Sequence, residues 1–340
     1  MEYPILSHNV NLRPYNSFGI AAVAKHFTSF STVQHLDDIL QWPEAKQLPF
    51  VLGGGSNMLL IKNVDALVMH NCIDGLEIIY ENEAIAHVKA GAGISWHAFV
   101  LFCLDHSLGG AENLSLIPGS IGASPMQNIG AYGVELKDIF LSLSAWHIKE
   151  NVLVNFNKAD CKFGYRESVF KNELKHQFII TDVTFVLQKK HQLNTRYGAI
   201  EKALEENGIV SPTIQDVSAV IIRIRQQKLP DPKEIGNAGS FFKNPEIDNS
   251  EFERLKLAFP NIVGYAVNET KIKLAAGWLI EQCGWKGFRQ GDAGCHAMQA
   301  LVLVNYGNAS GNEILQLAQK IIDSVQQKFN VTLHMEVNVV

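Results

Sequence analysis

Residues 236–245 (GNAGSFFKNP) contain one hydroxyl in a setting that could hold a proton donor still. Ser240 lies between small residues on one side and two phenylalanines on the other. Glycine allows a backbone to approach a ligand closely, and the aromatic pair can anchor the segment in a core. A lysine and an asparagine follow, adding a cation and an amide. The pattern indicates a general acid beside a reaction centre, while a tight turn leading into a buried strand remains the alternative.

Two glycine-rich segments could bind phosphate groups through their backbone. They are residues 53–57 (GGGSN) and residues 117–133 (IPGSIGASPMQNIGAYG), and backbone N–H groups in such loops can converge on phosphate oxygens. Neither is a Rossmann fingerprint, because residues 53–58 lack the last glycine of GxGxxG and lead into a strand-like MLLI segment. No GxxxxGK[ST] motif is present. The loops therefore predict a flavin or another dinucleotide on a different α+β scaffold.

The elements that must position these segments change in type along the chain. Apolar, β-branched runs predict strands in the first half, at residues 49–52, 58–61, 66–70, 76–80, 85–90, 142–147 and 178–187. Residues 91–110 change to a helical period, with Ser95 as N-cap and Gly109 or Gly110 as the stop. Its buried face is expected to consist of Trp96, Phe99, Val100, Cys103 and Leu104.

Helices dominate after about residue 194. The periodicity predicts them at residues 199–206, 217–228, 251–258, 273–283 and 313–329, before a strand-like end at 331–340. With 340 residues, two or three domains are expected, and 47% hydrophobic with 19% charged residues is typical of a globular protein.

Charge and cysteine content narrow the function classes. A net charge of −5 argues against a nonspecific binder of nucleic acid or membrane surfaces. No apolar run approaches the ~20 residues of a membrane span, and the N-terminus shows no signal-peptide pattern. The five cysteines are scattered and the 12 histidines form no HxH or HExxH pair. We therefore expect reduced thiols, a cytoplasmic location and no metal site.

Several segments, in order, resemble the UDP-N-acetylenolpyruvoylglucosamine reductase (MurB) family. They are residues 52–57 (LGGGSN), 117–133, 161–168 (CKFGYRES) and 229–245 (LPDPKEIGNAGSFFKNP), joined by 273–287 (KLAAGWLIEQCGWKG), 299–305 (QALVLVN) and Glu336. The resemblance begins near Asn16 (NSFGI) and runs to the end of the sequence. The surroundings of Tyr265 and residues 273–287 are similar to the longer, type I class of the family.

The resemblance implies an α+β fold with an FAD-binding domain of the vanillyl-alcohol-oxidase (PCMH) type and a C-terminal α/β substrate-binding domain. The implied division is 1–70 and 71–189 for two FAD-binding subdomains and 190–340 for the substrate-binding domain, whose last strand returns to the active site. The implied reaction is NADPH-dependent reduction of UDP-N-acetyl-3-O-(1-carboxyvinyl)-glucosamine to UDP-N-acetylmuramate through non-covalent FAD. This step of peptidoglycan synthesis serves cell wall biogenesis, and with it cell shape and division. We expect a cytoplasmic monomer without nucleic-acid or membrane partners.

The family's three catalytic residues match Arg166, Ser240 and Glu336. Arg166 would pair with the substrate carboxylate as an enolate develops, Ser240 would donate the proton, and Glu336 would polarise the substrate or relay protons. Pattern alone leaves alternatives, because Arg166 could form a surface ion pair with Glu167 or Asp160. Glu336, in the alternating LHMEVNVV segment, could equally be an outward-facing strand carboxylate.

The resemblance also implies two sets of binding residues. Those for FAD are Gly53, Gly54, Gly55, Ser56, Asn57, Pro118, Gly119, Ser120, Gly122, Ala123, Ser124, Asn128, Gly130, Ala131, Tyr132 and Gly133. Those for the uridine diphosphate of the substrate are Tyr197, Lys228, Asn244, Tyr265 and Gln299. Two tryptophans, Trp278 and Trp285, are expected to pack between helices rather than stack on a ligand.

Two other functions remain open from the sequence. One is a flavin oxidase of alcohols or aldonolactones on the same scaffold, which often carries its flavin covalently on histidine or cysteine. The other is a non-catalytic nucleotide-binding or regulatory protein that has kept the fold. The joint presence of Arg166, Ser240 and Glu336 favours the reductase.

Overall fold

The computed structural model describes residues 3–340 and divides the chain into two compact units. Unit 1 comprises Met1–Val10, Ala24–Gly54 and Val64–Gln227; unit 2 comprises Asn11–Val23, Gly55–Asn63 and Lys228–Val340. Residues 190–227, expected in the substrate-binding domain, make their contacts within unit 1. The functional division at residues 70 and 189 stays a prediction.

Unit 1 contains a four-stranded sheet whose central strands are parallel. In spatial order the strands are β1 (Ser7–Asn11), β2 (Val23–Phe30), β5 (Val64–Asn71) and β3 (Phe50–Leu52). Both β2 and β3 pair with β5 in parallel. Helix α1 (Val33–Leu40) connects β2 to β3, and it begins where Thr32 Oγ1 accepts a hydrogen bond from the His35 N–H at 3.0 Å. The strands expected at 49–52 and 66–70 are confirmed, whereas β2 and α1 were not predicted.

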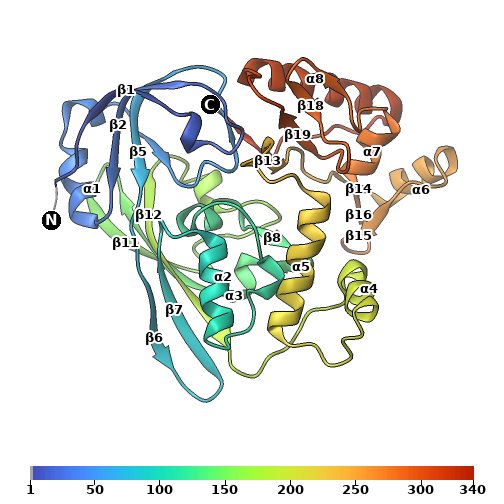
Figure 1. The fold of residues 1–340 in the computed structure, drawn as a ribbon, viewed down its shortest axis with the longest axis horizontal. Helices are drawn as coiled ribbons and strands as arrows, with labels where there is room; N and C mark the ends of the chain where they lie inside the picture. Colours follow the sequence, from blue (N-terminus) through green and yellow to red (C-terminus); the bar gives the residue numbers. More distant parts are fainter. Residues whose placement is uncertain (1–2) are drawn as a thin grey trace. The chain divides into compact units, whose positions relative to one another are not determined.

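A larger antiparallel sheet forms the rest of the unit 1 core. Its strands, in order, are β11 (Val152–Asn157), β10 (Phe140–His147), β12 (Phe178–Gln188), β7 (Ile85–Gly91) and β6 (Leu76–Glu81). Helix α2 (Trp96–Asp105) lies against it, as Figure 1 shows. All five apolar residues predicted for its inner face are buried, and Phe99 packs on Phe185 of β12 with ring centroids 4.3 Å apart. Ser95 is at the N-cap position but makes no capping bond through its side chain, and the helix ends at Asp105, ahead of the two glycines.

Short elements complete unit 1. They are the hairpin β8 (Gly130–Ala131) and β9 (Val134–Glu135), α3 (Leu136–Ile139), α4 (Gly198–Glu206) and α5 (Ile214–Lys228). Helix α5 begins three residues earlier than predicted, because Thr213 and Asp216 exchange hydrogen bonds in a capping arrangement. Its final residue, Lys228, is assigned to unit 2.

Unit 2 is built on two small sheets and three helices. The first sheet is β13 (Gly236–Ser240), β19 (Val302–Asn305), β18 (Ala293–Cys295) and β17 (Arg289–Gln290), and the second is β14 (Glu246–Asp248), β16 (Lys271–Leu274) and β15 (Gly264–Ala266). The helices are α6 (Asn249–Ala258), α7 (Ala276–Gln282) and α8 (Gly311–Phe329), with α8 packed on β18 and β19 (Figure 1). A separate pair joins β4 (Met58–Leu59) to β20 (Asn338–Val339) in parallel.

For two elements of unit 2, the predicted bounds are wrong. The helix expected over 273–283 is α7 alone, because residues up to Leu274 pair into β16. The strand expected over 331–340 is regular only at β20. The predicted packing role of the tryptophans is confirmed: Trp278 lies 5.8 Å from the Phe329 ring, and Trp285 Nε1 donates to Ser324 Oγ at 2.7 Å.

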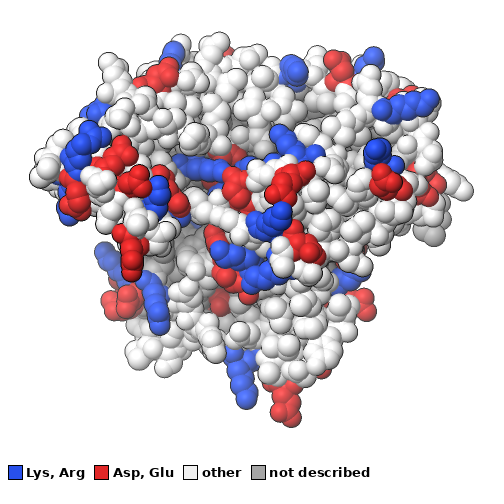
Figure 2. All heavy atoms as spheres, turned by 180° about the vertical axis from the view of Figure 1, so that it is seen from behind, with Lys and Arg blue, Asp and Glu red and all other residues white. Residues whose placement is uncertain are grey.

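The charged side chains are mixed in sign on the face shown in Figure 2, where lysines and arginines alternate with aspartates and glutamates. Among residues 3–340, no helix combines the length and apolarity that crossing a membrane requires.

Candidate functional site

In unit 1, two glycine loops lie so close together that a side chain at Gly53 or Gly54 would collide with the second loop. A Cβ atom at Gly53 would lie 2.5 Å from Ser120 Oγ, and one at Gly54 would lie 2.9 Å from Gly119 Cα. Gly119 also has a φ of 114°, which side chains other than glycine rarely allow. The Ser120 hydroxyl is buried and finds no hydrogen-bond partner within residues 3–340. Such an orphan hydroxyl between two backbone loops fits a site for phosphate oxygens.

The second loop is held by α2 and the residues before it. The Trp96 N–H donates to Gly119 O at 3.0 Å, and the Leu116 N–H donates to His97 Nδ1 at 3.0 Å. His97 therefore carries no proton on Nδ1, and burial, helped by Arg225, lowers its pKa. Further on, a Cβ at Gly122 would lie 2.7 Å from Ala92 Cβ, so this turn also requires glycine. The whole loop is thus fixed by backbone contacts.

Asn128 organises the next part of this segment. Its side chain is fully buried; Nδ2 donates to Glu135 Oε2 at 3.1 Å and to Gly164 O at 3.0 Å, while Oδ1 accepts from the Lys137 N–H at 3.0 Å. The β8–β9 hairpin that follows turns at Tyr132 and Gly133, whose φ values are 49° and 79°. Two positive φ values in a two-residue turn are the signature of type I′. Asn128 therefore ties residues 117–133 to Gly164 and to the start of α3.

Arg166 is placed by this hairpin. It lies in a tight turn closed by reciprocal backbone hydrogen bonds between Gly164 and Glu167, and its φ of 55° is unusual for a residue with a side chain. Its Nη2 donates to Gly130 O at 2.6 Å, and the residue is half-buried. A strained backbone at a charged residue is often a mark of function. The structure thus brings the predicted catalytic arginine to the predicted FAD loop.

Arg225, which was not predicted, lies on α5 against the same loop. Its guanidinium bonds with the Tyr132 hydroxyl, and its buried Nε donates to no acceptor within residues 3–340. No carboxylate of the described chain pairs with it, and burial lowers its pKa. A buried cation without an anion is costly unless a ligand supplies one. The sequence held one signal for Arg225: it lies three residues before Lys228, and helix residues with this spacing share one face.

Tyr197 is the one predicted substrate ligand in unit 1. It is the N-cap residue of α4, is 48% exposed, and meets the Tyr132 ring edge-on at 5.4 Å between centroids. A predicted FAD residue, Tyr132, therefore contacts a predicted substrate residue, Tyr197, through their rings.

In unit 2, Ser240 ends β13 immediately after a bulge. The register of β13 against β19 shifts between Asn237 and Ser240, and Gly239 has a φ of 69°. A bulge re-aims the side chain that follows it. Ser240 is exposed, whereas Phe241 and Phe242 are 0% and 1% exposed. The expected anchoring of this segment by the aromatic pair is confirmed.

Glu336 is tied to the same strand by backbone bonds. Its N–H donates to Phe241 O at 2.8 Å, and Met335 forms a bridge with Phe242. On the other side, Asn57 Nδ2 donates to Glu336 O at 3.3 Å, and Asn338 Nδ2 donates to Asn57 O at 2.9 Å. The structure thus places Glu336 beside the residue that follows Ser240, and places the end of the LGGGSN motif next to both.

The remaining predicted substrate residues divide into two groups. Asn244 Oδ1 accepts from the Ala276 N–H at 3.0 Å, and Gln299 Oε1 lies 3.0 Å from where a Cβ at Gly277 would be, so each side chain lies against the start of α7. Tyr265 is 56% exposed on β15, and Lys228 is exposed at the end of α5.

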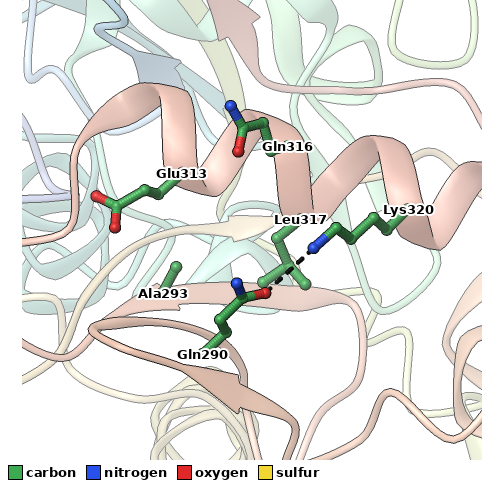
Figure 3. Close-up of a pocket in the computed structure, with 6 residues that line it drawn as sticks. All are labelled: Gln290, Ala293, Glu313, Gln316, Leu317 and Lys320. Atoms are coloured by element: carbon green, nitrogen blue, oxygen red, sulfur yellow. Dashed lines mark hydrogen bonds between the residues drawn. The ribbon is translucent and has the colours of Figure 1, made fainter.

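Figure 3 shows a small pocket of unit 2 between α8 and the β17–β18 hairpin. It has a volume of about 40 Å³ and is crossed by a hydrogen bond of 3.2 Å from Lys320 Nζ to Gln290 Oε1. This volume admits water but no nucleotide. None of the predicted site residues lines it.

Comparison with known proteins gives two family matches. The model described as the C-terminal domain of UDP-N-acetylenolpyruvoylglucosamine reductase matches residues 231–340, and an FAD binding domain model matches residues 24–152. The second match includes the loops that approach each other at Gly53 and Ser120. FAD binding thus agrees with the buried Ser120 hydroxyl found there.

Curated relatives match over nearly the whole chain. The UDP-N-acetylenolpyruvoylglucosamine reductase of Flavobacterium johnsoniae is 52% identical over 336 residues, covering 98% of this chain and 99% of the relative. That of Pseudomonas aeruginosa is 47% identical over 334 residues, covering 98% of each. Among solved structures, the MurB enzyme of Thermus caldophilus aligns with a TM-score of 0.69 and 22% identity over 99% of both chains. The expected fold class is confirmed.

Proposed function

Because this chain belongs to the UDP-N-acetylenolpyruvoylglucosamine reductase family, we propose how its own residues perform the family's reaction. The chain is an FAD-containing oxidoreductase of peptidoglycan synthesis that reduces UDP-N-acetyl-3-O-(1-carboxyvinyl)-glucosamine to UDP-N-acetylmuramate with NADPH. FAD, when bound, supplies the hydride transfer between NADPH and the terminal carbon of the enol ether.

FAD is held without a covalent bond by the two glycine loops of unit 1 in this proposal. The orphan Ser120 hydroxyl beside Gly53 would bind a phosphate oxygen, together with backbone N–H groups of the loop that starts at Pro118. Arg225 would place its cation toward an anionic part of the cofactor, which explains a buried guanidinium without a carboxylate. Other predicted residues would contribute backbone contacts; among them are Gly55, Ser56, Ala123, Ser124 and Ala131.

Arg166 is proposed to bind the carboxylate of the enolpyruvyl group. Its planar guanidinium can hold a carboxylate through parallel hydrogen bonds, and it would stabilise the negative charge that spreads into that group as hydride arrives. The bond from Nη2 to Gly130 O restricts the side chain, so that little reorganisation is needed during the reaction.

Ser240 is proposed to donate the proton to the carbon next to this carboxylate. An isolated serine is a weak acid, so its position must compensate, and fixed orientation contributes as much as ~7–11 kcal/mol in the best cases. The fully buried Phe241 and the bulge before Ser240 supply such a fixed position. Glu336, bonded through its N–H to Phe241 O, would polarise the substrate or relay the proton.

The uridine diphosphate would be bound by Tyr197, Lys228, Asn244, Tyr265 and Gln299. A lysine and amide side chains suit pyrophosphate oxygens, and exposed tyrosines suit the uridine and its phosphates. The position of Asn244 and Gln299, each against the start of α7, supports a shared role for these two.

Location and assembly belong to the same proposal. All five cysteines are free thiols, which supports a reducing, cytoplasmic compartment. Burial raises the pKa of Cys161 and of Cys295 to about 12, so these two thiols are poor nucleophiles. We propose a monomer, to be tested by light scattering on the eluting protein.

The near-complete match to curated reductases is the single observation that carries the function. The test is NADPH oxidation by the purified yellow protein, with and without the enolpyruvyl substrate. We expect oxidation that depends on substrate, and yellow colour that leaves the polypeptide on denaturation. Colour retained on the denatured chain would indicate a covalent-flavin oxidase, and a lack of substrate-dependent oxidation would favour the regulatory alternative.

A further inference from the structure

The bulge in β13 inserts one extra residue immediately before Ser240. Asn237 pairs with Val304 and Ser240 pairs with Val302, so two residues of β13 lie opposite one residue of β19. The second of these two is Gly239, with its left-handed φ of 69°. Such a bulge bends the strand and changes the direction of the side chain that follows. Whatever holds the bulge therefore sets the direction of the Ser240 hydroxyl.

One buried side chain, that of Asn237, spans this bulge. Its Oδ1 accepts a hydrogen bond from the Gly239 N–H at 2.9 Å, and its Nδ2 donates to Ile235 O at 2.8 Å and to Pro230 O at 3.1 Å. The residue is 2% exposed. Asparagine commonly fixes a local backbone conformation through such a bond to the N–H two residues further on. Both protons of the amide and its oxygen are thus bonded inside the protein.

Packing does not fix Gly239, so the bond from Asn237 is what restrains it. A Cβ atom at Gly239 would meet nothing of the described chain within 4 Å. The two residues that flank the bulge are anchored, because the Asn237 N–H donates to Ser17 O at 2.9 Å and the Phe241 N–H donates to Leu301 O at 2.8 Å. The amide oxygen of Asn237 therefore restrains the one stretch before Ser240 that neither anchor covers.

We propose that Asn237 is a positioning residue for the proton donor: its amide oxygen fixes the bulge that aims the Ser240 hydroxyl. The inference rests on the proposed role of Ser240 as proton donor. It assigns Asn237 no contact with substrate or flavin and no part in the proton transfer itself. All of the hydrogen bonds that carry it join residues of unit 2.

The test is anaerobic stopped-flow measurement of both half-reactions in the FAD-loaded enzyme. Asn237→Ala should slow flavin reoxidation by the enolpyruvyl substrate about 100-fold, the loss that a displacement of about 1 Å can cause. Flavin reduction by NADPH and the affinity for substrate should stay nearly unchanged, because neither requires the proton.

Asn237→Asp is the variant expected to restore the rate. A carboxylate oxygen still accepts from the Gly239 N–H but cannot donate to Ile235 and Pro230, so this protein should be less stable than the wild type. Its reoxidation rate should nevertheless stay within about threefold of the wild-type rate, because the bond across the bulge is kept. Reoxidation as slow as in Asn237→Ala would overturn the proposal.

Asn71→Ala is the matched control. Asn71 is 6% exposed in unit 1 and uses its amide in the same way: Oδ1 accepts from the Ile73 N–H at 3.2 Å, and Nδ2 donates to Ile180 O at 2.9 Å. The control should lose stability and keep both half-reactions at the wild-type rate. Equal slowing in Asn71→Ala and Asn237→Ala would assign the effect to general loosening and refute the positioning role.

If Asn237→Ala does not fold, Gly239 gives a second test of the same bulge. Gly239→Ala and Gly239→Asn both strain the left-handed backbone without a collision, and asparagine tolerates that conformation better. Reoxidation should therefore be slower in Gly239→Ala than in Gly239→Asn. The opposite order would indicate obstruction by the larger side chain and contradict the proposal, as would wild-type rates in both.

Ser240→Ala distinguishes this inference from the proposed function. Reoxidation at the wild-type rate in Ser240→Ala would exclude the serine as proton donor and end the inference with it. Slow reoxidation in Ser240→Ala, together with a wild-type rate in Asn237→Ala, would leave the proposed function intact and refute only the positioning role. In the double variant, Asn237→Ala should add no further slowing, because it acts through the missing hydroxyl.

Discussion

At the scale of residues, the side chain proposed to react differs from the neighbouring residues that hold it in place. Ser240 is exposed, but the next residue is fully buried and bonded through its carbonyl to Glu336. The hydroxyl is therefore set by a rigid neighbour rather than by its own contacts. Such an arrangement suits a proton donor, whose position matters more than its acidity.

Replacing Ser240 tests this assignment. Ser240→Ala should leave flavin reduction by NADPH largely intact and slow flavin reoxidation by substrate by several orders of magnitude, because only the second half-reaction needs the proton. Stopped-flow absorbance of the flavin measures both steps. Ser250→Ala, an exposed serine at the start of α6, is the control and should change neither. Reoxidation at the wild-type rate in Ser240→Ala would remove the serine from the mechanism.

Resemblance named the candidate residues, and the structure adds what holds them. The left-handed backbone of Arg166 and its bond to Gly130 arise from contacts between segments about 36 residues apart, which no local pattern reveals. Arg225 was missed because a charged residue on a helix is ordinarily solvated, and only packing against Tyr132 shows that this one is enclosed. Sequence reasoning identifies chemistry more readily than burial.

At the scale of elements, helices with strong periodicity were predicted well and pairing-dependent elements less well. Helix α8 ends at Phe329 as predicted, where Asn330 adopts a left-handed conformation, and it begins two residues earlier than predicted, because Ser310 and Glu313 form a capping box. The segment at Lys271–Leu274 has a helix-compatible sequence but pairs with two strands, β14 and β15. In this segment, pairing with the two neighbouring strands outweighed the intrinsic helix propensity of the residues.

Strand β13 depends on a close backbone contact that can be tested. A Cβ at Gly236 would lie 2.2 Å from Phe18 O, so Gly236→Ala should push the strand away and destabilise the protein by about 1–3 kcal/mol. Because the same strand ends at Ser240, substrate reoxidation of the flavin should slow as well. Thermal denaturation and stopped-flow kinetics measure the two effects.

Gly198→Ala is the control for this substitution, because a Cβ at Gly198 meets nothing within 4 Å. Its unfolding midpoint should stay equal to that of the wild type or rise slightly. A Gly236→Ala protein as stable as this control would show that β13 can shift without cost.

At the scale of the whole molecule, each unit is assembled from distant stretches of chain. Unit 2 takes in Asn11–Val23 and Gly55–Asn63, and the NSFGI segment is central to it: Ser17 N–H donates to Gly55 O at 3.0 Å, and Asn237 N–H donates to Ser17 O at 2.9 Å. The NSFGI segment, part of the motif pattern seen in the sequence, therefore has a structural role in unit 2.

Removing the cofactor should lower the stability of the protein. When FAD is absent, the buried Ser120 hydroxyl is left without a hydrogen-bond partner and the Arg225 cation without an anion, so the apoprotein should unfold at a lower temperature. Restoring FAD to 100 times its Kd should recover about 2.7 kcal/mol. Thermal scans of apo and reconstituted protein measure the difference. Equal midpoints would mean that FAD does not bind the folded state preferentially.

The pairing of β4 with β20 has a consequence for how the protein is made. Asn57 leaves the ribosome about 281 residues before Asn338, its hydrogen-bonding partner. At ~5–20 residues per second, the early strand waits on the order of 15–60 s with its edge unsatisfied. During translation the nascent polypeptide therefore carries an open strand edge, which invites chaperones or mispairing until Asn338 and Val339 have been added.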